Sequence, residues 1–109
     1  MSARQTFIRI NKQGPTEILD YTLDWSDIMT LIDDEIVDTQ HAVRHYDADA
    51  PDLDDPDAMR IDTSQFTSMD TTHRVTGGIP GEKYVATTTV RTREDRVFVR
   101  SELIRCIRR

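Results

Sequence analysis

A regular alternation of apolar and polar side chains between residues 17 and 25 constrains the fold of this chain more than any other feature. Leu19, Tyr21, Leu23 and Trp25 fall on one side of the segment, and aspartates and a threonine fall on the other. Successive side chains of a β-strand point to opposite faces, so the pattern predicts a half-buried strand. A shift by one residue would carry the aspartates into the core, and the register is therefore strongly specified.

The rest of the chain repeats this signal in shorter segments. We predict further strands at residues 6–10, 35–45, 59–66, 71–76, 83–91 and 97–107, with turns at 11–15, 77–81 and 93–96. In the segment 35–45, Val37, Thr39, His41 and Val43 are expected on one face. A single helical turn is expected over residues 26–32, with Ser26 as its N-cap. Short strands between turn signals predict an all-β, immunoglobulin or fibronectin type III-like β-sandwich of about seven strands.

The length of 109 residues fits one domain. We expect residues 1–16 to form an N-terminal arm or extra strand, and residues 17–107 to form the sandwich, with an acidic loop at 47–57. Two prolines and six aspartates in those eleven residues favour a solvated, self-repelling loop. Weak calcium binding around Asp54 and Asp55 is the alternative, although the spacing lacks the glycine and glutamate of an EF-hand.

Charge is distributed unevenly around a net value of −6. Residues 20–70 contain fifteen acids against Arg44 and Arg60, whereas residues 91–109 contain seven arginines against three acids. Such a chain could dock between oppositely charged neighbours, or both patches could simply be solvated. Direct nucleic-acid binding is not expected, because phosphates would meet a mainly acidic surface.

Targeting and redox signals are sparse. No segment approaches the ~20 apolar residues of a membrane span, and the N-terminus has no secretory apolar region. A lone cysteine, Cys106, excludes an internal disulfide and is interpreted as a small apolar residue of the last strand in a chain made in a reducing cytoplasm.

The segment from Gly77 to Tyr84 contains a glycine-proline-glycine turn followed closely by a tyrosine. In immunoglobulin-like sandwiches a tyrosine at this place hydrogen-bonds back to the backbone and pins the connection between sheets. We therefore interpret Gly77, Gly78, Gly81 and Tyr84 as a structural corner rather than a ligand site.

Other residues with chemical potential do not form a recognisable active site. His41 and His45 share one face of a predicted strand, but without a third nearby ligand they predict no metal site. Trp25 is either a core residue or an interface anchor. The chain has no Gly-x-Ser-x-Gly elbow and no phosphate-binding loop. We predict no enzymatic activity, no cofactor and no small-molecule ligand.

Three segments of the sequence resemble motifs of a known family. Residues 17–26, EILDYTLDWS, are similar to the "VLDYxxDWS" signature of small virion proteins of tailed bacteriophages, and residues 34–39 are similar to its "DxIVxT" motif. Residues 75–90, VTGGIPGEKYVATTTV, are similar to the pattern "VxxxGGxxGxxYxVTNxVxT". The chain thus resembles the phage fiber-tail adaptor proteins, a family of immunoglobulin-like domains. Ala86 and Thr88 replace part of the usual pattern, and the loop 47–57 is longer and more acidic than expected.

The resemblance implies a structural role and no catalytic residues. It implies an adaptor in the tail or neck of the virion, made in the host cytoplasm, that bridges fibers or other tail components and contacts copies of itself. A capsid decoration or surface-binding immunoglobulin-like domain is the alternative. The interface residues that we expect are Trp25, Arg91, Arg93, Arg96 and Arg100, because guanidinium groups pair well with carboxylates.

Overall fold

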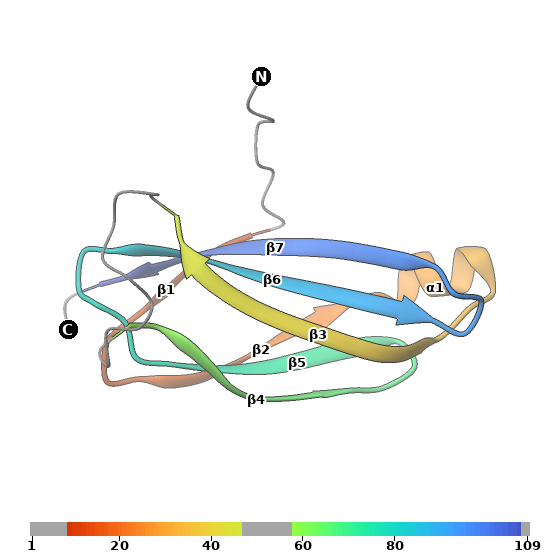
Figure 1. The fold of residues 1–109 in the computed structure, drawn as a ribbon, viewed down its shortest axis with the longest axis horizontal. Coiled ribbons are helices and arrows are strands. Elements are labelled where there is room, and N and C mark those ends of the chain that lie inside the picture. Colours follow the sequence, from red (N-terminus) through yellow and green to blue (C-terminus); the bar gives the residue numbers. More distant parts are fainter. Residues whose placement is uncertain (1–8, 47–57, 108–109) are drawn as a thin grey trace, which may run out of the picture.

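The computed structural model describes residues 9–46 and 58–107, which form seven strands and one short helix. The elements are β1 (Arg9–Gln13), β2 (Ile18–Asp24), α1 (Ser26–Ile32), β3 (Ile36–His45), β4 (Arg60–Phe66), β5 (Asp70–Thr76), β6 (Lys83–Thr92) and β7 (Val97–Cys106). The acidic segment 47–57, with its calcium alternative, lies outside the described residues. The strands form two layers, with α1 at the end of the molecule where β6 turns into β7 (Figure 1).

The two layers are a four-stranded sheet and a three-stranded sheet. Sheet A has the order β1-β7-β6-β3, and sheet B has the order β2-β5-β4. All neighbours pair in antiparallel fashion except β1 and β7, which run parallel. If the strands are lettered A to G along the chain, the sheets contain the B-E-D and C-F-G arrangements of an immunoglobulin-type sandwich. The all-β sandwich expected from the alternation is thus confirmed.

The core between the sheets consists of two apolar clusters. One lies toward the start of β6 and is formed by Met59, Val75, Tyr84, Ala86, Ile104 and Cys106. The other lies toward α1 and is formed by Leu23, Trp25, Met29, Ile36 and Val90. The predicted inward row of β2 is confirmed, since its side chains are buried or half-buried while the intervening residues are exposed.

Three local predictions were wrong. The first strand was placed at residues 6–10, but β1 extends to Gln13, whose buried side-chain amide donates hydrogen bonds to the carbonyls of Glu17 and Val75. Val37 is 47% exposed, because an irregularity in β3 between Ile36 and Asp38 changes which side chains face the core. These contacts form between distant segments, and local patterns do not reveal them.

The third wrong prediction concerns the residue that caps the start of α1. Ser26 does not cap α1 through its side chain. Instead, its backbone N–H donates to Asp24 Oδ1 at 2.8 Å. Among the described residues, no helix is long and apolar enough to span a membrane.

Candidate interaction surfaces

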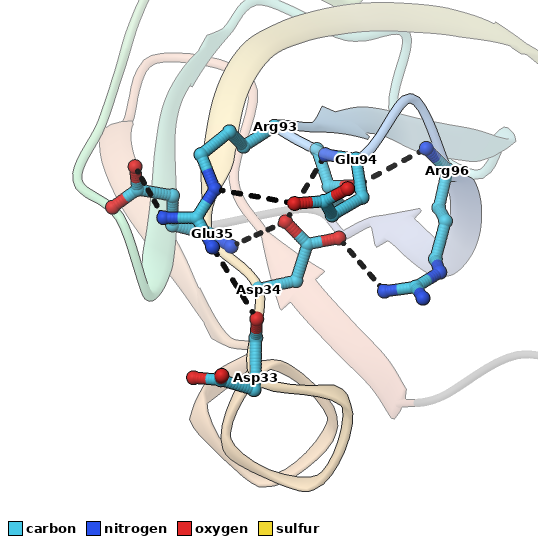
Figure 2. A network of polar contacts seen from close by, with 7 residues as sticks. Asp33, Asp34, Glu35, Arg93, Glu94 and Arg96 are labelled. Atoms are coloured by element: carbon cyan, nitrogen blue, oxygen red, sulfur yellow. Dashed lines mark hydrogen bonds and ion pairs between the residues drawn. The ribbon is translucent and has the colours of Figure 1, made fainter.

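The hairpin between β6 and β7 carries three of the four arginines expected at an interface, on or next to its turn. It packs against the junction of α1 and β3, as Figure 2 shows. Arg93 contacts Glu35 Oε1 and the carbonyl of Asp33, both at 3.4 Å. Arg96 Nη1 donates to Asp34 Oδ2 at 3.1 Å. The arginine-rich end of the chain therefore neutralises acids of its own acidic middle.

Asp34 is the centre of this network. Its side chain is fully buried, and its Oδ1 accepts hydrogen bonds from the backbone N–H groups of Glu35 and Glu94. Burial alone would raise the pKa of Asp34, but hydrogen bonds from Thr92, Glu35 and Glu94 and the charge of Arg96 together lower it. Asp34 therefore stays ionised and ties the helix end to the hairpin.

Arg91 and Arg100 also have partners within the chain. Arg91 lies 3.7 Å from Asp38 across the β3–β6 pair. Arg100 donates to the carbonyl of Asp24 at 2.9 Å, and its guanidinium lies 4.1 Å from the centre of the Trp25 ring. All four predicted interface arginines therefore have intramolecular contacts, and a role for them in binding a partner stays a prediction.

Trp25 is a core residue. Only 1% of it is exposed, beneath Arg100. Its indole N–H donates to the hydroxyl of Thr71, which is also buried, at 3.0 Å. Of the two roles open to it from the sequence, this burial favours the core role, and a role as interface anchor stays a prediction.

The segment between β5 and β6 has the geometry of a corner. The backbone N–H of Ile79 donates to the hydroxyl of Tyr84, five residues further along, at 3.0 Å. Gly77, Gly78 and Gly81 have φ values of 75°, 125° and 92°. Residues that carry a Cβ atom rarely adopt such positive φ values. We infer that these four residues fix the connection between the sheets.

Gly78 is also constrained by its neighbours. A Cβ atom at this position would lie 2.8 Å from Cys106 Sγ and 3.2 Å from Met59 Cε. Cys106 is a free, buried thiol whose pKa is raised by burial, so the inert apolar role expected for it matches its surroundings.

A buried polar group spans the two sheets, and the sequence did not reveal it. His73 of β5 and Glu102 of β7 are fully buried, with Nε2 and Oε1 2.9 Å apart. The ring of His41 lies 5.2 Å from that of His73, although the two residues are far apart in the sequence. Burial first, and then the charge of His73, lower the pKa of His41 from 6.5 to about 4. No group of three potential ligands in the described residues could hold a metal ion.

The outer face of sheet A carries an uncharged strip, which we define as Gln40, Ala42, Thr87, Thr89, Val99 and Ser101. Thr89 pairs with Gln40 on one side and with Val99 on the other, and Val99 is 58% exposed. The outer face of sheet B is charged instead, with Asp20 and Arg74 paired at 3.0 Å. Apolar side chains at the surface of a sheet suit contact with another protein. The alternation of apolar and polar residues does not show whether another protein covers the outer face of sheet A.

Comparison with known families distinguishes a role in the phage tail from that of a capsid decoration domain. The model of the podophage GP4 fiber-tail adaptor protein gp77 family matches residues 13–105. The chain belongs to this family. The protein is therefore a structural component of a podophage tail, and the family match starts at Gln13 of β1 and reaches nearly to the end of β7. No curated protein matches the chain.

Proposed function

We propose that this fiber-tail adaptor is a non-enzymatic bridge in the tail or neck of the virion. It holds tail and fiber subunits together through protein–protein contacts and is present in several copies. The family match carries this proposal. The position of the titratable core residues supports the absence of catalysis, because His73 and Glu102 are fully buried and cannot meet a substrate.

The uncharged strip of sheet A is the contact face that the geometry favours. Most of its side chains are short, its Val99 is 58% exposed, and Val97 beside it is 59% exposed. A sheet face with such side chains can pack against another sheet with little loss of side-chain entropy, since threonine, valine and serine have few rotamers. Specific interfaces bury about 800 Å² per partner, so we expect the contact to extend beyond the strip to neighbouring residues of sheet A.

A phage that lacks the gene and is complemented in the host tests this proposal. The wild-type chain should restore fiber attachment and be found in purified virions by quantitative mass spectrometry. Val99→Glu should reduce its incorporation, because a carboxylate would be desolvated at the contact. Ile18→Glu is the matched control, since Ile18 is equally apolar and 63% exposed but lies on the outer face of sheet B.

Fibers attached normally without the protein would refute the adaptor role. Equal incorporation of the Val99→Glu and Ile18→Glu variants would refute the assignment of the contact to sheet A.

A further inference from the structure

A row of three cations crosses the outer face of sheet A at the end opposite the hairpin. Lys12 of β1 pairs with Arg105 of β7, and Arg105 pairs with Lys83 of β6. Residues directly opposite on adjacent strands share a face, and all three side chains are exposed. This cationic row lies where β7 ends, at the left of Figure 1.

The cationic row differs from the hairpin arginines because it has no acid partner among the described residues. Within the described part of the chain, none of the three side chains forms an ion pair. The ammonium group of Lys83 lies 5.6 Å above the ring of Tyr46, which is a contact that leaves its charge uncompensated. By contrast, Arg91, Arg93 and Arg96 each have a carboxylate within 4 Å.

Like charges directly opposite one another on neighbouring strands destabilise a sheet. Within residues 9–46 and 58–107, the row therefore has no ion pair that offsets this repulsion, in a chain whose net charge is −6. A depression of about 220 Å³ adjoins the row and is lined by Lys83, Arg105, Glu82 and their neighbours. Glu82 is the carboxylate of this depression, and it makes no ion pair with either cation.

We propose that the cationic row binds an acidic segment of a partner protein, with the carboxylates of that segment aligned along Lys12, Arg105 and Lys83. This inference rests on the proposed function, because the row lies on the same face of sheet A as the uncharged strip. The strip would then supply contact area, and the row would select a partner with carboxylates at one end. Peptide carboxylates fit better than nucleic-acid phosphates, because the acids elsewhere on the chain repel a polyanion longer than the row.

Binding to a short fluorescein-labelled oligo-L-glutamate peptide, no longer than the cationic row, followed by anisotropy at increasing salt, tests the chemistry directly. The triple variant Lys12→Gln/Lys83→Gln/Arg105→Gln should bind about tenfold more weakly, since each exposed ion pair contributes roughly a twofold change. Arg74→Gln is the matched control, because Arg74 is an exposed cation that lies on sheet B and is already paired with Asp20. It should bind as the wild type does, and thermal melts should show that both variants are folded.

Four results would overturn the inference. They are equal peptide binding by the triple variant and the wild type, an equal loss in Arg74→Gln, tighter binding of duplex DNA than of the peptide, and self-association that the triple variant abolishes. The last two would replace the partner protein by nucleic acid or by a second copy of this chain.

Incorporation into virions separates this inference from the adaptor role. If the wild-type chain enters virions and the triple variant enters equally well, the row is not the contact and the adaptor role stands. If the wild-type chain is absent from virions, the adaptor role fails, and the peptide titration still decides whether the row binds carboxylates.

Discussion

Substitution of Gly78 by alanine tests the corner between β5 and β6 most sharply. The new Cβ would lie 2.8 Å from Cys106 Sγ, closer than such atoms approach, and the backbone φ of 125° disfavours any side chain. Backbone strain of this kind costs about 1–3 kcal/mol, and overpacking a filled core costs about 1–3 kcal/mol more. We expect Gly78→Ala to lower the free energy of unfolding by about 2–6 kcal/mol.

Gly81→Ala is the matched control. Gly81 has a φ of 92°, but a Cβ there would meet no atom within 4 Å. Its substitution should therefore incur the backbone strain alone, about 1–3 kcal/mol. The difference between the two variants measures the contact of Gly78 with Cys106.

Guanidinium denaturation of both variants, and of the double variant Gly78→Ala/Cys106→Ala, completes the experiment. Removal of the sulfur should restore part of the stability, with a coupling of about 1 kcal/mol or more between the two sites. A Gly78→Ala variant no less stable than Gly81→Ala, or two additive substitutions in the double variant, would refute the reasoning.

Three further predictions concern the core. Tyr84→Phe should lower the free energy of unfolding by about 1–2 kcal/mol, because the N–H of Ile79 loses its acceptor; an unchanged denaturation midpoint would contradict this. Glu102→Leu should lower the free energy of unfolding by about 3–5 kcal/mol, because it leaves His73 buried without its partner. Adding His73→Phe should recover much of the loss, since an apolar pair can replace a buried polar one; a double variant less stable than the single variant would contradict this. The pKa of His41 is about 4 in the folded chain, below its unfolded value of 6.5. Neutral His41 therefore contributes fully to the free energy of unfolding above pH 6.5, and this contribution is lost as the pH falls toward 4. With partial solvent screening it amounts to about 1–2 kcal/mol, and His41→Gln should flatten this part of the stability profile.

The strands of this sandwich could be predicted because half-buried strands carry their burial pattern in the sequence. The inward row of β2, the turn at Gly77–Gly81 and the helical turn after Trp25 all follow from local patterns. The irregularity that exposes Val37 could not be foreseen in this way. It depends on how β3 pairs with β6, and a change of one residue in that pairing inverts the faces of the segment.

The surface was harder to predict than the core. Composition identified the arginine-rich end as a source of interface contacts, but Arg93 and Arg96 lie against acids about sixty residues earlier in the chain. In the same way, His73 and Glu102 meet only because β5 and β7 belong to facing sheets. The cationic row consists of single basic residues from three strands, and it becomes visible only once the pairing of those strands is known.

The position and orientation of the protein in a cryo-electron microscopy map of the intact virion test the central claim most directly. We predict density for the sandwich between tail and fiber subunits, with the outer face of sheet A covered and carboxylates of a neighbour opposite Lys12, Lys83 and Arg105. A sandwich on the head lattice, or one at the tail whose sheet A face is bare to solvent, would contradict the account.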